Sequence, residues 1–238
     1  PAGNADRRDA RGGGVKVGQG MIELIPVKTH IVTKRDDIAD VIEKYAGPQI
    51  GPGDVVSVAE SVVAITQGRY RRPEEMNPSL LAMILSRFIH VDSSCSSPCG
   101  MQCTMDEGGT LRVLMAFIVG GIAKVFGNSG MFYKLAGEQA ALIDDVTGTM
   151  PPFDKVLVFG PKEPVKVAEK IKERLGCFGA AVADVNDLKR AAVLGVSDGL
   201  DPHELSRILI DNPFGNANQQ TPIVIIKNYA AAVAATRG

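Results

Sequence analysis

Three aspartates have the residue type and the placement that a hard metal ion requires. Asp144 and Asp145 stand together in the stretch DDVTGTMPP, and Asp184 follows the apolar run from Ala180 to Ala183. Each lies where a loop meets an apolar strand or helix, so the carboxylates could converge on a divalent cation such as Mg²⁺ or Mn²⁺. Spacing alone favours a second interpretation, in which Asp144 and Asp145 cap or solvate a loop and Asp184 starts an Asx-turn.

A second candidate centre is formed by Cys95, Cys99 and Cys103, which recur at every fourth residue of SSCSSPCGMQC. This spacing matches neither a zinc ribbon nor a ferredoxin-type cluster. Three thiolates with His90 or Asp106 nearby could hold a soft metal or provide a nucleophile, and packed or solvated thiols are the alternative. The many Ser, Pro and Gly residues predict that the segment is a loop.

The composition narrows the class of protein. Lys and Arg total 26 against 27 for Asp and Glu, and aromatic residues make up 5% of the 238 residues. The chain therefore has neither a long-range positive field nor stacking platforms for nucleic acid, and we expect no nucleic-acid or membrane partner. Four cysteines without a disulfide framework and the absence of a secretory signal lead us to expect a reducing, cytoplasmic location.

Strand and helix patterns alternate along the chain, which predicts an α/β fold (mixed α+β). We expect one compact domain over residues 21–238, with a mixed sheet and flanking helices, after a flexible N-terminal arm at residues 1–20. The predicted strands are Ile22–Val27, Asp54–Ala59, Val156–Phe159, Ala180–Ala183 and Pro222–Lys227. The predicted helices are Asp36–Tyr45, Pro78–Ile89, a buried helix in Leu111–Gly127, and Pro164–Leu175, while Glu60–Gln67 fits either strand or short helix.

Four segments resemble one known family. The segment GDVVSVAESVVAITQGRYRR at residues 53–72 and IELIPVK at residues 22–28 are similar to signature segments of the coenzyme F-420-0:L-glutamate (γ-glutamyl) ligases. LIDDVTG at residues 142–148 and VADVND at residues 182–187 lie where that family has its aspartate-bearing metal loops. The similarity extends, with gaps, over most of residues 22–228.

The resemblance implies an enzyme that joins an amine such as L-glutamate to a small carboxylated substrate. It implies GTP as co-substrate, a divalent metal (Mg²⁺ or Mn²⁺), an acyl-phosphate intermediate and a homodimer. Asp144 and Asp184 would then be metal ligands supported by Asp145. The residues that the resemblance places at the nucleotide are Lys28, Thr29, His30, Thr147 and Asn186.

The chain also departs from the family pattern. Ile65 stands where the family has a lysine that meets phosphate, and residues 214–222, FGNANQQTP, replace an acidic, glycine-rich loop. The segment ADVNDL keeps Asp184 and Asn186 but lacks the threonine, glycine and arginine of the family loop. Two alternatives therefore stay open: a divergent relative that binds metal or a small ligand without ligase activity, and a protein in which the Cys95, Cys99 and Cys103 segment carries metal or thiol chemistry.

Overall fold

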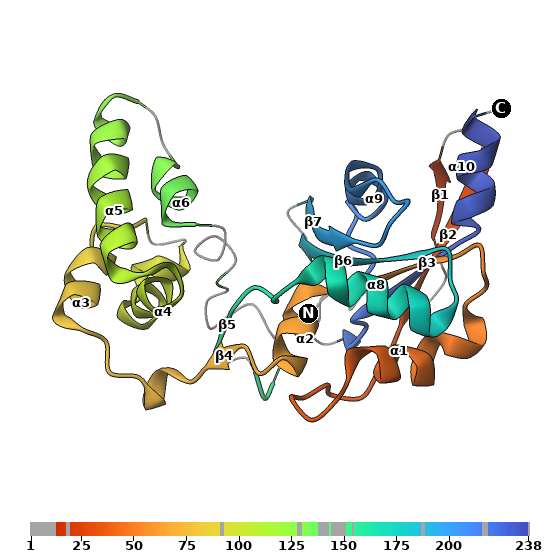
Figure 1. Ribbon diagram of the computed structural model, residues 1–238, viewed down its shortest axis with the longest axis horizontal. Helices are drawn as coiled ribbons and strands as arrows, with labels where there is room; N and C mark the ends of the chain where they lie inside the picture. The colour runs from red at the N-terminus through yellow and green to blue at the C-terminus, as the bar shows by residue number, and fades with distance from the viewer. Residues whose placement is uncertain are drawn as a thin grey trace, which may run out of the picture. The chain divides into compact units, whose positions relative to one another are not determined.

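The described part of the chain forms two compact units. The computed structural model describes residues 13–17, 20–90, 93–127, 130–137, 143, 151–153, 155–186, 189–215 and 219–237. The sheet unit contains the residues up to Gln67 and from Pro161 onward, and the helical unit contains Gly68–Gly160 (Figure 1). The predicted α/β class with a mixed sheet and flanking helices is confirmed, although the sequence predicts one domain where the chain has two units.

The sheet unit is built on a six-stranded mixed sheet with the order β1-β2-β8-β3-β6-β7. The strands are β1 (Gly13–Val17), β2 (Gly20–Val27), β3 (Val55–Ala59), β6 (Gly179–Asn186), β7 (Arg190–Val196) and β8 (Ile223–Lys227). β3 and β6 pair in parallel, and β8 runs antiparallel to both β2 and β3. The carboxyl ends of β2, β3 and β6 therefore share one edge of the sheet, which we call the carboxyl edge.

Helices cover both faces of this sheet (Figure 1). The first face packs against α1 (Ile38–Ala46), α2 (Glu60–Thr66) and α8 (Pro164–Leu175), and the second against α9 (Pro202–Ile208) and α10 (Tyr229–Arg237). Along β3, Val56 and Val58 enter the first core and Val55 enters the second, as the two-residue period of a strand requires. Burial on both sides explains why the central strands are continuously apolar.

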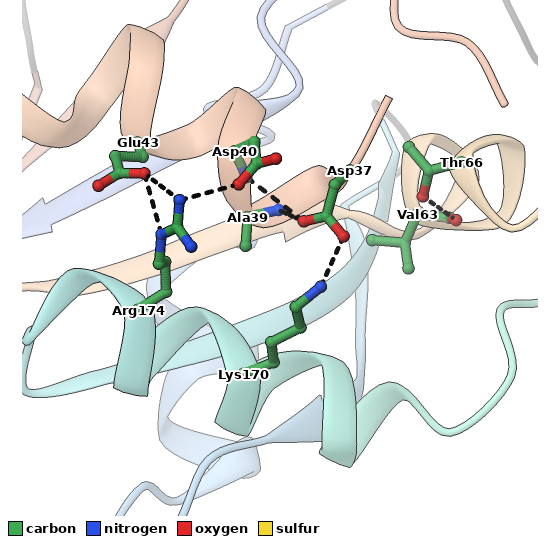
Figure 2. Close-up of polar contacts among 8 residues, drawn as sticks. All are labelled: Asp37, Ala39, Asp40, Glu43, Val63, Thr66, Lys170 and Arg174. Carbon is green, nitrogen blue, oxygen red and sulfur yellow. Dashed lines mark hydrogen bonds and ion pairs between the residues drawn. The ribbon is translucent and has the colours of Figure 1, made fainter. Parts of the chain in front are cut away.

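Ion pairs join α1 to α8 at the surface of the sheet unit (Figure 2). Lys170 Nζ lies 2.5 Å from Asp37 Oδ2, and Arg174 contacts Glu43 at 2.8 Å and Asp40 at 3.1 Å. Asp37 also caps α1 by accepting a hydrogen bond from the backbone N–H of Asp40. Because these groups are exposed, the pairs contribute little to stability, and the apolar contacts beneath them carry most of the packing.

The helical unit consists of four α-helices, three-residue turns and a short ribbon in its described part. The elements are β4 (Tyr70–Arg71), η2 (Pro73–Glu75), α3 (Leu80–Ser86), η3 (Ser94–Ser96), α4 (Pro98–Gly108), α5 (Thr110–Val125), α6 (Met131–Ala136) and β5 (Leu157–Val158). β4 and β5 pair antiparallel. The main core of this unit forms between α3, α4, α5 and α6, around Met101, Val113 and Phe132.

The loop predicted for the cysteine segment is wrong, because most of this segment is helical. Ser97 caps α4 by accepting a hydrogen bond from the backbone N–H of Gly100 at 3.0 Å. Pro98 occupies the first helical position, where its fixed φ favours helix and its missing N–H costs nothing. The Ser and Pro residues that suggest a loop thus start a helix.

The helix predicted in Leu111–Gly127 is confirmed as α5, but its predicted burial is wrong. Only one side packs into the core, through Val113, Ala116 and Gly120. The opposite side is exposed, to 73% at Leu111 and 84% at Val125. Its apolar residues beyond these two are Met115, Ile118, Val119, Ile122 and Phe126.

No single helix in the described ranges has both the length and the apolar character of a membrane span. α4 and α5 meet these criteria only when they are joined, and their axes are bent by 114°.

Most predicted elements of the sheet unit are confirmed, with small changes in their bounds. The ambiguous segment Glu60–Gln67 is the helix α2, and the helix Pro164–Leu175 has the predicted ends. The sequence pattern did not predict β7, α9 or α10. Strand β1 lies within residues 1–20, where a flexible arm was expected.

Candidate active site

The carboxyl edge brings together residues from three strands. The parallel pairing of β3 and β6 ends with Ala59 opposite Ala183, so the next residue of each chain segment is an acid, Glu60 and Asp184. On the β2 side, the N–H of Thr29 donates to the carbonyl of Gln220 at 3.0 Å. Ligands of α/β sheets typically bind outside the carboxyl ends of strands, so this edge is the natural place for a site in this unit.

Asp184 is the predicted metal ligand that the structure describes. It lies inside β6, opposite Ala192 of β7, rather than in the predicted turn. Its side chain is partly buried, and this burial raises the pKa of the carboxyl group above its ordinary value. A carboxylate whose charge is poorly solvated gains from a nearby cation, so its environment suits a hard metal ion.

Asn186 closes the turn between β6 and β7. Its Oδ1 accepts a hydrogen bond from the backbone N–H of Arg190 at 3.3 Å. This contact holds the end of β6 in register with β7 and so fixes the backbone two residues beyond Asp184. The structure thus shows a positioning contact for Asn186, while its predicted nucleotide contact stays a prediction.

The three residues that follow β2 have different surroundings. Thr29 is buried and donates its hydroxyl to the carbonyl oxygen of His30 at 2.8 Å, whereas Lys28 is exposed. The His30 ring contacts the Tyr45 hydroxyl through Nδ1 at 3.0 Å and Asp36 Oδ1 through Nε2 at 3.2 Å. These contacts anchor the segment to the start and end of α1, and the exposed Lys28 is the cationic residue of the three.

Glu60 is a feature of this edge that the sequence reasoning missed. It is only 6% exposed and is the first residue of α2, directly after β3. A carboxylate in the first turn of a helix is favoured by the helix dipole, which offsets part of its burial cost. The signal available in the sequence was an acid between an apolar strand and an apolar helix.

Three predicted site residues, Asp144, Asp145 and Thr147, lie outside the described residues. Within the described ranges, no group of three or more His, Cys, Asp and Glu residues is arranged to hold a metal ion. Of the three predicted metal ligands, the described residues therefore include Asp184, and its role as a ligand stays a prediction.

The predicted cysteine site is divided between two places in the helical unit. Cys95 is buried in the main core, with its Sγ 3.2 Å from the Thr104 hydroxyl. Cys99 and Cys103 instead pack with Met76 in a second cluster. Burial, followed by the charge of nearby Asp106, raises the pKa of Cys103 to about 12, so this group is a thiol at neutral pH and a poor nucleophile.

Comparisons with known proteins point to one family. A family model described as F420-0:Gamma-glutamyl ligase matches residues 26–185. Coenzyme F420:L-glutamate ligase of Archaeoglobus fulgidus is 25% identical over 186 residues, which are 75% of this chain and 66% of that relative. The chain thus spans slightly less than two thirds of the relative's length. The matched range contains the end of β2, Glu60 and Asp184.

Proposed function

The chain belongs to the F420-0:gamma-glutamyl ligase family, and from this premise we propose that it is a metal-dependent, nucleotide-driven amide ligase. Its substrates are a small carboxylated molecule and an amine such as that of L-glutamate, with GTP as the nucleotide. The observation that carries the proposal is the carboxyl edge, where the ends of β2, β3 and β6 place Lys28, Glu60 and Asp184 within the matched range.

The proposed chemistry has two steps. The substrate carboxylate attacks the γ-phosphorus of GTP to give an acyl phosphate and GDP, and the amine then attacks the acyl carbon, releasing phosphate and a proton. A bound Mg²⁺ or Mn²⁺ neutralises the crowded negative charge. Asp184 is proposed to hold this ion, and Lys28 is proposed to meet phosphate. Asp144 and Asp145 stay predicted ligands.

Ligand-dependent thermal stability tests this proposal directly. GTP with Mn²⁺ should raise the melting temperature more than either alone, because a ligand that binds the native state stabilises it by mass action. Asp184→Asn should abolish the increment that needs both. Asp211→Asn changes an exposed aspartate paired with Lys189 and should keep it. No increment with GTP or ATP in the unaltered chain would overturn the proposal.

One observation favours a second candidate function, a relative that binds metal or a small ligand without ligation. Ile65, where the family has its lysine, is 4% exposed on α2, so an apolar side chain has replaced a phosphate-binding one. Nucleotide turnover separates the two functions. Release of GDP and phosphate that requires both an amine and a carboxylic acid supports the ligase, and tight binding without turnover supports the second candidate.

We also propose that two copies pair through the exposed side of α5, defined above. α3 extends this surface with Leu80, Met83, Ile84 and Phe88, and the Phe88 ring lies 6.0 Å from that of Phe117 on α5. The exposed parts of these side chains together reach on the order of 1,000 Å², compared with about 800 Å² buried by each partner in a stable complex. A surface of this size and apolar character is unusual for a monomer.

Sedimentation at micromolar concentration tests the pairing. The unaltered chain should sediment as a dimer and the double variant Ile122→Glu, Val125→Glu as a folded monomer, because two charges would be buried in the interface. Lys134→Glu, an exposed change on α6, should leave the dimer intact. A monomeric unaltered chain, or a dimer that survives the double change, would contradict the proposed interface.

A further inference from the structure

α4 presents two thiols on one side of the helix. Cys99 and Cys103 are four residues apart, which places their side chains next to each other on the helix surface. Both pack in the same cluster, together with the side chain of Met76. Cys99 Sγ lies 4.0 Å from the carbonyl oxygen of Pro73, so the chain around η2 runs along this side of α4.

Met76 brings a third sulfur to the two thiols. Its Sδ lies 3.8 Å from Cys103 Sγ. Three sulfurs around one ion at metal–sulfur distances of about 2.3 Å are separated from each other by about 4 Å in a trigonal arrangement. The observed separation is therefore the one that two ligands of a single three-coordinate ion would have.

The donor set and its surroundings select the kind of ion. Two thiols and a thioether are soft ligands of the type that selects Cu(I). A structural Zn²⁺ requires four ligands, and the described residues contain no group of three or more His, Cys, Asp or Glu residues arranged to hold a metal ion. The buried side chains of Leu157 and Phe159 pack in the same cluster as the three sulfurs. Cys99 is only partly buried and gives access from solvent.

We propose that Cys99, Cys103 and Met76 form a binding site for Cu(I). The two cysteines bind as thiolates and the methionine as a neutral thioether, so one Cu⁺ enters and two protons leave without any change of oxidation state. The negative charges of Asp106 and Glu107 act on Cys103, as does the positive charge of Arg71. Cys95 is excluded from the site because it packs in the separate core around Met101.

Anaerobic titration of the full chain with Cu(I), against a coloured Cu(I) chelator, tests the site. The expected result is one Cu(I) per chain, with three sulfur neighbours in the X-ray absorption spectrum. Cys99→Ser should weaken binding by at least about 100-fold, and Met76→Leu, which preserves volume, by about 10-fold. The Met76→Leu spectrum should show two sulfur neighbours.

Cys95→Ser is the matched control, because its oxygen can keep the contact with Thr104. It should bind Cu(I) as the unaltered chain does. The proposal is overturned if the unaltered chain binds no Cu(I), if Cys95→Ser loses as much affinity as Cys99→Ser, or if Met76→Leu keeps three sulfur neighbours. Since Cys99 is partly exposed and Met76→Leu is isosteric, both variants test the site without depending on a change at the buried Cys103.

Discussion

The two units differ in how completely they bury their apolar residues. In the sheet unit, helices cover both faces of the sheet, and the carboxylate of the buried Asp54 is paired with Lys227. In the helical unit, α5 places one side in the core and leaves a row of large apolar residues exposed, ending at Phe126 with 83% exposure. Substitutions in the sheet unit should therefore change the free energy of unfolding, and those on the exposed side of α5 should change association.

The largest expected effect comes from adding one methyl group at Gly195 in the sheet unit. A Cβ at Gly195 of β7 would lie 2.4 Å from the carbonyl carbon of Pro164 and 2.5 Å from the nitrogen of Val165, at the start of α8. Gly195→Ala should therefore force β7 and α8 apart and lower the free energy of unfolding by roughly 3 kcal/mol. Urea denaturation measures this change.

Gly121→Ala in α5 is the matched change in the helical unit. A Cβ at Gly121 meets no atom within 4 Å, and alanine favours a helix more than glycine does. This variant should raise the free energy of unfolding by up to about 1 kcal/mol. Equal losses in both variants would show that the two units do not differ in packing as described.

A somewhat smaller loss is expected from Asp54→Asn. The Asp54 carboxylate is buried and accepts hydrogen bonds from Lys227 Nζ at 2.6 Å, the Gly51 N–H at 2.7 Å and the Asn228 N–H at 2.9 Å. Asparagine cannot compensate the Lys227 charge, and we expect a loss of about 2 to 3 kcal/mol. Asp40→Asn, at an exposed pair with Arg174, should cost far less in the same denaturation experiment.

The same carboxylate should make the stability of the sheet unit depend on acid. Burial alone would raise the pKa of Asp54, but the hydrogen bonds and the charge of Lys227 outweigh it and hold the pKa below its usual range. A group with a lowered native pKa stabilises the fold above its unfolded pKa and loses that contribution as pH falls through the native pKa. Denaturation below about pH 4 should therefore destabilise the unaltered chain more steeply than Asp54→Asn.

The strands and helices that could be predicted from sequence are those whose apolar residues recur with the period of a strand or a helix. The β2 and β3 strands and the α8 helix follow from apolar periodicity, and the periodicity reflects cores that these elements share. The burial of α5 could not be predicted in this way, because an apolar run does not reveal whether core residues or solvent lie against it. For α4, the capping role of Ser97 and Pro98 was present in the sequence and was misinterpreted.

At the candidate site, the resemblance named Asp184 but not Glu60. Asp184 lies at the carboxyl edge, but its position beside Glu60 depends on the pairing of β3 with β6, which are more than a hundred residues apart in the chain. The cysteines show the opposite case, since their even spacing suggests one site whereas Cys95, in the turn η3, enters a different cluster from Cys99 and Cys103 of α4. Sequence spacing does not show which core a helical residue enters.

The smallest expected effect comes from Asp184→Asn, and its sign separates a residue that binds a ligand from one that supports the fold. Burial raises the pKa of Asp184, so its charged form costs stability at neutral pH, and that cost disappears as pH falls through the raised pKa. Asp184→Asn should therefore raise the free energy of unfolding of the ligand-free chain at pH 7. Denaturation at pH 7 and at pH 4 should show this gain only at the higher pH.

With Mn²⁺ and GTP present, the unaltered chain should instead be more stable than Asp184→Asn, because the proposed ligands stabilise the chain that keeps the Asp184 carboxylate. A loss of stability in the ligand-free Asp184→Asn variant would mean that the carboxylate supports the fold of β6 and β7 instead. A buried acid that weakens the fold when it is alone and strengthens it when ligands are bound is the behaviour expected of a binding residue.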